Sequence, residues 1–169
     1  MRDGEKESGI SPILIVYDER KKALWVLPVE SKGSVDIVVQ WVCEKLDEAG
    51  YRGMPVTLRS DQEEAIVALK KAIAVKRKAE TPMIESPIRE SKSNGSVERA
   101  VRIWRAHFLT LKSHLESRIR MQIESHHPIR QWLANWAGEA IIKFKVHQNG
   151  RTSYEMMTTH RCKHFVVGF

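Results

Sequence analysis

The sequence predicts an α/β fold, a sheet with helices on its faces, and three observations point to this class. Short β-branched apolar runs alternate with longer segments of helical periodicity, in the order β-β-α-β-α-β-α-α. The chain has 169 residues, which is the length of one ordinary domain. Hydrophobic residues make up 42% of it, enough to form a core. Because the strands alternate with helices, we expect the later strands to be parallel.

The first third of the chain predicts a hairpin and a helix. Two apolar runs, residues 13–17 and 23–29, flank the charged turn DERK, as two antiparallel strands would. A helix over about 34–49 follows, because its apolar residues recur at steps of three and four. Gly50 and Gly53 then end the helix. Its inward face consists of Val35, Val38, Val39, Val42, Leu46 and Ala49.

The rest of the chain predicts two strand–helix units and a last helix. MPVTLRS and ETPMIES are short strands, and SDQEEAIVALKKAIAVKR is the helix between them. A polar loop, residues 87–95, precedes a long helix that runs to about Met121, and the last helix follows the sequence HHP. The inward residues of the three helices are Ile66, Leu69 and Ile73; then Val97, Val101, Trp104, Phe108, Leu111 and Leu115; then Ile129, Leu133, Trp136, Ala140 and Phe144.

The composition restricts the partner and the compartment. A net charge of +7 and a pI of about 9.5 favour a polyanionic partner. Charge alone is equally compatible with a basic protein that has no polyanionic partner. No apolar run approaches the ~18 residues of a membrane span, and MRDGEKESGIS lacks the apolar stretch of a signal peptide. Cys43 and Cys162 form no CxxC motif, which indicates free thiols in a reducing compartment. We therefore expect an intracellular protein, nuclear if the host is eukaryotic.

Two acids stand where a sheet edge could form a site. Asp61 follows the strand PVTLRS, at the carboxyl end where ligands of such sheets usually bind. Glu98 opens the long helix that is reached through one further strand. Two carboxylates that meet at one edge can hold Mg²⁺ or Mn²⁺, because both ions prefer oxygen ligands. Two such ions, about 3.5–4 Å apart, stabilise the attacking and leaving oxygens of a phosphoryl transfer.

Each acid also has a purely structural interpretation. Ser60 or Asp61 could cap the following helix, with Glu63 or Glu64 completing a capping box. Glu98 could be a first-turn acid that the helix dipole favours. In that case Ser93 or Ser96 would be the cap of its helix.

Three arginines accompany Glu98 on the long helix. Arg102 and Arg105 follow it by four and seven residues, which places them on the same helical face, and Arg99 is adjacent. Arginines in line with a metal-binding acid are placed to contact phosphates near the metal. A solvated charged face is the alternative interpretation of the same three residues.

Three blocks of the sequence resemble the catalytic core of retroviral-type integrases from retrotransposons. LRSDQEEAIVAL resembles the second-acid motif of that family, a strand, an Asp and a helix. ESPIRESKSNGSVERAVRIW resembles the third-acid motif, in which a proline-containing loop and Asn-Gly precede Val-Glu and a long helix. NGRTSYEMM resembles the closing Gly-(Arg/Lys)-Thr-Pro-Tyr-Glu block, with Ser153 in place of the usual proline. The resemblance extends from about Pro12 to Tyr154.

The resemblance implies a ribonuclease H-like mixed sheet with helices on both faces. It also implies that Asp61 and Glu98 are catalytic ligands of Mg²⁺ or Mn²⁺. The flexible Asn94-Gly95 loop would deliver Glu98, and Ser93, Asn94 and Gly95 would lie beside bound DNA. The family's chemistry is 3′-end processing and strand transfer, in which water or a DNA 3′-hydroxyl attacks a phosphodiester. The expected partner is DNA without sequence preference, and a homo-oligomer is left open.

The chain departs from the family's pattern at its first acid. That acid lies on a central strand that precedes the hairpin, whereas this chain has two strands before its first helix and Asp18 lies at the wrong end of them. We therefore expect the first central strand to be missing and to lie upstream. Residues 1–12 would be a polar N-terminal remnant, residues 13–155 the integrase core-like domain, and residues 156–169 a tail or the start of another module. Such a chain would bind DNA and be inactive as given. The alternative is a non-catalytic nucleic-acid-binding module of the same fold.

Overall fold

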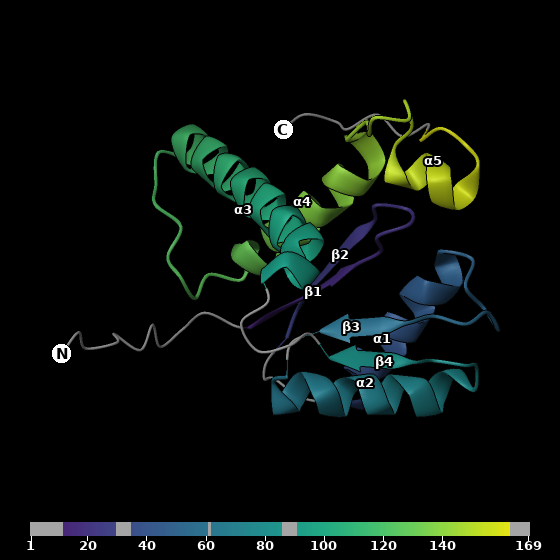
Figure 1. Ribbon diagram of the computed structural model, residues 1–169. Coiled ribbons are helices and arrows are strands. Elements are labelled where there is room, and N and C mark those ends of the chain that lie inside the picture. The colour runs from purple at the N-terminus through teal and green to yellow at the C-terminus, as the bar shows by residue number, and fades with distance from the viewer. Residues whose placement is uncertain (1–11, 30–34, 61, 86–90, 163–169) are drawn as a thin grey trace.

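The computed structural model describes residues 12–29, 35–60, 62–85 and 91–162. The order of strands and helices expected from the sequence is confirmed, and one short helix, α5, follows it (Figure 1). The elements are β1 (Ile13–Tyr17), β2 (Leu24–Pro28), α1 (Asp36–Glu48), β3 (Leu58–Ser60), α2 (Glu64–Arg77), β4 (Met83–Glu85), α3 (Ser91–Ile119), α4 (Ile129–Phe144) and α5 (Ser153–Thr158). None of the described helices is long and apolar enough to cross a membrane.

The strands form two separate pairs. β1 and β2 are antiparallel, with Ile15 opposite Val26, and β3 and β4 are parallel, with Leu58 opposite Met83. The expected parallel pairing of the later strands is therefore confirmed. Figure 1 shows the strands in the order β2, β1, β3 and β4, yet over the described ranges no hydrogen-bonded pairing joins the first two to the last two. The interruption falls where the resemblance places the first central strand.

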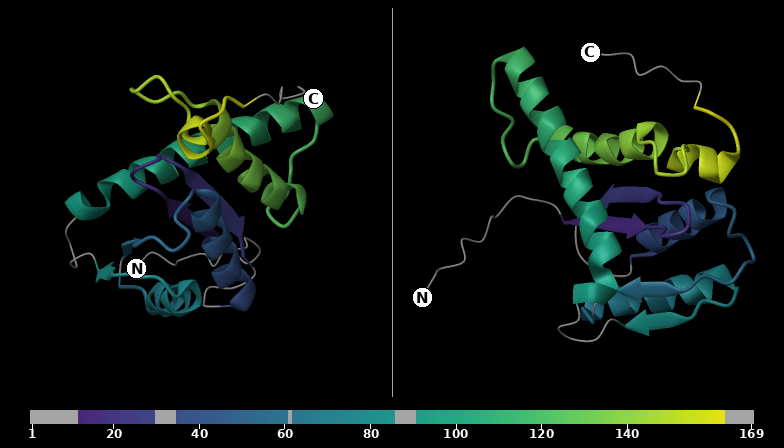
Figure 2. Two further views of the ribbon diagram at one scale, coloured as in Figure 1. Left: turned by 90° about the vertical axis from the view of Figure 1, so that its right-hand side faces the viewer. Right: turned by 45° about the horizontal axis from the view of Figure 1, so that its top comes forward.

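Helices cover the strands on both faces, as expected. On one face Leu24 and Val26 of β2 pack with Trp104 of α3 and with α4. On the other, Leu14 and Val16 of β1 pack with α1 and α2. Strand β1 is thus apolar on both sides, a pattern typical of strands in the middle of a sheet. Figure 2 shows α3 running past both strand pairs.

Helix α4 approaches β2 closely because of a glycine. A Cβ atom at Gly138 would lie 2.9 Å from Cγ2 of Val26, closer than real carbon atoms approach. The neighbouring residues Ala134 and Ala137 are small and almost completely buried. Trp104 of α3 donates a 2.9 Å hydrogen bond from Nε1 to the carbonyl oxygen of Ala134. Small residues in α4 therefore let the strand and the long helix pack against it.

The apolar stripes of the helices are largely confirmed, with differences at their ends. Trp104 and Phe108 of α3 are buried, as are Leu69 and Ile73 of α2. In α4, however, the expected inward residue Phe144 is 44% exposed. The inward face of α4 is rotated because the helix packs through its small residues. It consists of Leu133, Ala134, Ala137, Gly138, Ile141 and Ile142. Val35 is also wrongly assigned to the core, since it precedes α1 and is 49% exposed.

The turn of the first hairpin is held by Asp18. Its Oδ1 accepts hydrogen bonds from the backbone N–H groups of Arg20 and Lys21, and its Oδ2 accepts one of 2.7 Å from the Tyr51 hydroxyl. Lys21 donates from Nζ to the carbonyl oxygen of Ala49 and lies over the Tyr51 ring, 5.2 Å from its centroid. Burial, and then the hydrogen bond to Asp18, raises the pKa of Tyr51 well above its usual value. Asp18 therefore has a structural role in this turn, and its carboxylate oxygens are not used as metal ligands.

Candidate functional site

Helix α3 begins earlier than the sequence predicted. Its first residue is Ser91, so the expected loop 87–95 is helical over its second half, and Asn94-Gly95 forms no flexible loop. Glu98 is consequently the eighth residue of the helix, and the first turn contains no acid. The first-turn interpretation of Glu98 and the capping interpretation of Ser93 and Ser96 are both wrong. The packed stripe of this long helix compensates for the weak helix propensity of Asn and Gly, which costs about 1 kcal/mol for glycine.

Glu98 is exposed to solvent on α3, and its turn of the helix is anchored to the first hairpin. Two residues before it, the hydroxyl of Ser96 donates a hydrogen bond to a carboxylate oxygen of Glu19. Burial raises the pKa of the Tyr17 hydroxyl, and the negative charges of Glu19 and Asp18 raise it further. The positive charge of Arg99 opposes this shift. The hydrogen bond between Ser96 and Glu19 positions the helical turn that carries the Glu98 carboxylate.

Asp61 lies outside the described residues, so its distance from Glu98 stays a prediction. The structure does describe the strand that leads to it. β3 ends at Ser60, which lies opposite Glu85, the last residue of the parallel strand β4. The carboxyl ends of both strands thus meet at one edge, as expected of a ligand-binding edge. Of the alternatives, the capping box is not formed, because Glu63 occupies the N-cap of α2 without a side-chain cap hydrogen bond.

The three arginines lie on the solvent side of α3. Arg99, Arg102 and Arg105 are exposed, and Arg102 and Arg105 follow Glu98 by one and two helical turns. The same helix directs Trp104 and the rest of its apolar stripe into the core. Gly95 is half-buried near the start of the helix, whereas the side chains of Ser93 and Asn94 lie outside the part that the structure describes. The sequence interpretation missed Arg118 and Arg120, which are exposed at the other end of α3 and extend its positive charge.

A buried lysine near β4 was also missed. Lys70 of α2 is only 4% exposed, and its ammonium group donates a 3.3 Å hydrogen bond to the carbonyl oxygen of Ile84. The periodicity of α2 contained the signal, because Lys70 lies four residues after Ile66 and three before Ile73, on the inward face. This side chain ties the helix to strand β4 and adds a positive charge beneath the strand.

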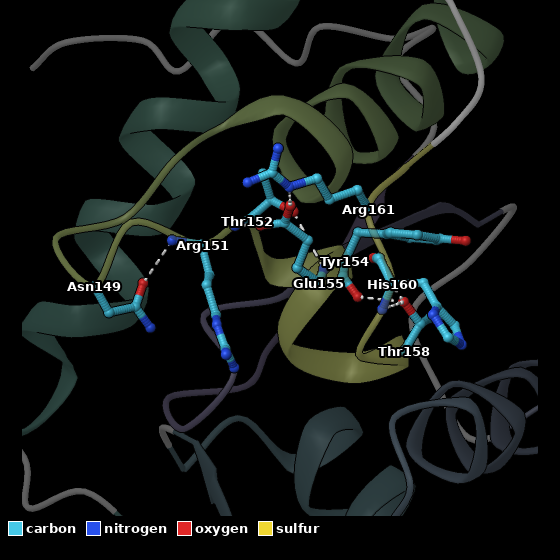
Figure 3. Close-up of polar contacts among 8 residues, drawn as sticks. All are labelled: Asn149, Arg151, Thr152, Tyr154, Glu155, Thr158, His160 and Arg161. Carbon is cyan, nitrogen blue, oxygen red and sulfur yellow. Dashed lines mark hydrogen bonds and ion pairs between the residues drawn. The ribbon is translucent and has the colours of Figure 1, made fainter.

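The closing block NGRTSYEMM forms a compact capped helix (Figure 3). Thr152 and Glu155 form a capping box, in which each side chain accepts a hydrogen bond from the other residue's backbone N–H. Asn149 accepts a 3.1 Å hydrogen bond from the N–H of Arg151, and Arg161 lies 3.5 Å from a carboxylate oxygen of Glu155. These contacts give the block a structural role: it fixes α5 at the end of the domain.

Among the described residues, the candidate site consists of the exposed carboxylate of Glu98 and the exposed arginines Arg99, Arg102 and Arg105 on the same helix. Within the described ranges, no group of three or more His, Cys, Asp or Glu side chains is placed to hold a metal ion. Asp61 is outside those ranges, so the metal site predicted from Asp61 and Glu98 is untested. The basic face of α3 is suited to phosphate groups, because guanidinium ions bind them through paired hydrogen bonds.

Comparison with solved structures relates this fold to known ones, although neither a family model nor a curated protein sequence matches the chain. It superimposes on the catalytic core domain of BIV integrase with a TM-score of 0.57 and 14% identity, over 87% of this chain and 85% of that one. For the simian T-cell lymphotropic virus intasome in complex with PP2A regulatory subunit B56 gamma, the TM-score is 0.65 at 11% identity, over 96% and 54%. For the HTLV-2 integrase catalytic core domain with magnesium, in a trimeric form, it is 0.54 at 12% identity, over 92% and 99%. The chain has the ribonuclease H-like fold of retroviral integrase catalytic cores.

Proposed function

We propose that this chain is an integrase core-like protein of a retrotransposon that binds DNA without sequence preference. The observation that carries the proposal is the exposed face of α3, where Arg102 and Arg105 follow Glu98 at one and two helical turns in an integrase-like fold. Arginines on one helical face contact successive phosphates, which gives affinity without base recognition. One of the similar structures is an intasome, and the net charge of +7 supports the same partner.

We propose that Asp61 and Glu98 hold Mg²⁺ or Mn²⁺ when DNA is bound. Glu98 is exposed at the surface and supplies the hard oxygen donors that these ions prefer. The HTLV-2 integrase core was solved in complex with magnesium, which supports the choice of ion. When bound, such an ion would polarise a phosphodiester and activate the attacking oxygen. The protein's own part would be to hold the phosphates, through Arg102 and Arg105, beside the two carboxylates.

We further propose that the chain as given does not cleave or join DNA. Two-metal phosphoryl transfer needs a carboxylate that both ions share. Asp18 is engaged with Tyr51 and the hairpin turn, which leaves it no part in such a site. The second candidate function follows from this: a non-catalytic nucleic-acid-binding module with a ribonuclease H-like fold. The interrupted sheet is the observation that favours it.

A plasmid-nicking assay tests the proposed inactivity, and a gel-shift measurement tests DNA binding. The 169-residue chain is incubated with supercoiled DNA and Mg²⁺ or Mn²⁺, beside an Asp61→Asn variant as control. We expect no nicking by either protein, together with retention of the plasmid in a gel-shift measurement. Metal-dependent nicking that Asp61→Asn abolishes would show a complete active site and contradict the proposed inactivity. Failure to retain DNA at low salt would contradict both functions.

We also propose that the protein is intracellular, and nuclear in a eukaryotic host. Cys43 and Cys162 are free thiols, which suits an intracellular protein, and a DNA partner suits the nucleus of a eukaryotic host. One similar structure is a trimeric form and another is an intasome. We propose that this chain likewise forms a homo-oligomer.

A further inference from the structure

One side of helix α3 is exposed to solvent from Glu98 to the end of the helix. The residues on this side recur at steps of three and four, as the residues of one helical face do. They are Glu98, Arg102, Arg105, Leu109, Ser113, Ser117 and, directly after the helix, Arg120. Arg102 and Arg120 are separated by about five helical turns, so both lie on the same side. Figure 2 shows that the far end of α3 extends past the strands.

Arginines stand at both ends of this exposed side. The first arginine group consists of Arg99, Arg102 and Arg105, and the second consists of Arg118 and Arg120, both exposed at the far end of the helix. The outward positions between the two groups hold one leucine and two serines, so the middle of the face is uncharged. Within the ranges that the structure describes, no hydrogen bond or ion pair engages the second group. Its charges are therefore available to an anionic partner.

The far end of α3 is held in place by Glu116. Its Oε1 atom accepts a 2.7 Å hydrogen bond from Nζ of Lys112 and another of 2.7 Å from the N–H of Ile123. Ile123 is only 6% exposed and packs in the cluster that contains Trp104 and Phe108. The second arginine group therefore stands at a fixed end of the helix. The charge of Glu116 is balanced by Lys112, so it does not cancel the charge of the arginines.

The distance between the two groups matches one turn of duplex DNA. A helix rises about 1.5 Å per residue, which places Arg99 and Arg120 about 32 Å apart along its axis. One turn of B-DNA is about 34 Å long. A sugar-phosphate backbone that contacts the first group therefore returns to the same side of the duplex near the second group. Between these points the backbone turns away, and the uncharged middle of the face lies opposite a groove.

We infer that α3 binds duplex DNA at two places one turn of the duplex apart, through the first and the second arginine group. The inference rests on the DNA binding proposed above and defines its substrate, a straight duplex of about ten base pairs or more. Duplex DNA is stiff over this length, because its persistence length is about 150 base pairs. A duplex that lies along α3 therefore stays close to both groups. Both groups contact phosphates, which position the duplex without reading its sequence.

Fluorescence anisotropy of the full chain on two duplexes of different length tests the inference. One has about 16 base pairs; the other has about six, closed by a loop, and is about 20 Å long, too short to reach both groups. Arg118→Glu with Arg120→Glu should weaken binding of the long duplex at least about fivefold and reduce its salt slope by about 2. Binding of the short duplex should change by no more than about twofold. The first group alone holds it, at a distance well beyond the screening length of about 8 Å at physiological salt.

Arg52→Glu with Arg161→Glu is the matched control, because it changes the net charge equally at exposed positions away from α3. This pair should weaken binding of the long duplex far less. Thermal melting followed by circular dichroism verifies that each variant is folded. An equal loss in the control pair overturns the inference, as does a second-group variant that weakens both duplexes equally or neither.

The first arginine group separates this inference from the function on which it rests. Arg102→Glu with Arg105→Glu should weaken binding of the long duplex. If this pair weakens binding while Arg118→Glu with Arg120→Glu has no effect, the second contact is wrong and the proposed DNA binding stands. If Arg102→Glu with Arg105→Glu has no effect either, both the proposed DNA-binding face and the inference fail.

Discussion

The hydroxyl of Ser153 donates a 2.7 Å hydrogen bond to the carbonyl oxygen of Lys22, so the last helix is joined directly to the turn of the first hairpin. Ser153 is fully buried, and its oxygen also lies 2.9 Å from Nε2 of His147. Because the single hydroxyl proton is directed to Lys22, the imidazole is the donor in the second bond. The imidazole of His147 therefore does not accept the Ser153 proton, which excludes a nucleophilic role for Ser153. The serine that replaces the usual proline instead ties α5 to the hairpin turn through its hydrogen bond.

The first prediction concerns pH. Burial, followed by the charges of Lys145 and Lys22, lowers the pKa of His147 below its ordinary value of 6.5. The unfolded chain therefore takes up a proton at higher pH than the folded chain does. Stability should be complete above pH 6.5 and should fall as the pH drops below it. Urea unfolding between pH 5 and 8 measures this (about the range over which histidine titrates).

A pair of variants identifies the group responsible. His147→Gln should reduce the loss of stability on acidification, because it removes the titrating ring and keeps a hydrogen-bond donor for Ser153. His114→Gln is the control, since His114 is exposed on α3 and should leave the profile unchanged. An unaltered profile in the first variant would assign the pH dependence to other groups.

The second prediction concerns the anchor of the hairpin turn. Tyr51→Phe removes the hydroxyl that donates to Asp18 and leaves that half-buried carboxylate with fewer partners. We expect the free energy of unfolding to fall by about 1–3 kcal/mol. Tyr154→Phe is the matched control, because none of the described hydrogen bonds uses its hydroxyl. Equal effects of the two changes, measured by urea unfolding, would show that the Asp18 contact contributes little.

The third prediction concerns the contact between α4 and β2. Gly138→Val should destabilise the protein by about 1–3 kcal/mol, because the new side chain collides with Val26, whose Cγ2 would lie only 2.9 Å from the added Cβ. Adding Val26→Ala should recover part of the loss by making room. Gly95→Ala should instead raise stability by up to about 1 kcal/mol, since nothing lies within 4 Å of its Cβ and alanine favours a helix. If both glycine variants behaved alike, close packing at Gly138 would not be the cause.

The fourth prediction concerns DNA. The affinity of the chain for duplex DNA should fall steeply as salt rises, because each phosphate contact releases counterions. Charge reversal in Arg102→Glu with Arg105→Glu should weaken binding and flatten that dependence. Arg52→Glu with Arg161→Glu changes the net charge equally at exposed positions away from α3 and should weaken binding far less. Fluorescence anisotropy measures both. An equal loss in the two pairs would mean that overall charge, and no particular face, determines the affinity.

The sequence was sufficient for the order of the elements and for most of the core. Periods of two and of 3.6 residues identified the hairpin and the long helices, and Trp104 and Phe108 are buried as their spacing predicts. The start of α3 was missed because Asn94 and Gly95 are typical of loops. Local preference there is worth about 1 kcal/mol, which the packing of a 29-residue helix outweighs. The rotation of α4 was missed because small residues gave no signal in a count of large apolar ones.

For the candidate site, the sequence could predict which residues share a helix, but not where that helix lies relative to the strands. The sequence identified Glu98 and the arginines correctly as residues of one helix, since spacing along a helix fixes which residues share a face. The position of Glu98 relative to the strands depends on contacts between distant segments, such as that of Ser96 with Glu19. No local pattern reveals such a contact. The capping box of Thr152 and Glu155, in contrast, is written in the sequence as T-x-x-E and could have been found.

The interruption between the strand pairs has a consequence for the exchange of amide hydrogens with heavy water. The N–H of Asp18 donates to Ala23, and the N–H of Val29 donates to Pro12, which fixes the alternation along β1. The amides of Leu14 and Val16 therefore point to β2, and those of Ile13, Ile15 and Tyr17 point to the opposite edge. Deuterium should enter β1 at every second residue first, so one strand would display fast and slow positions in strict alternation.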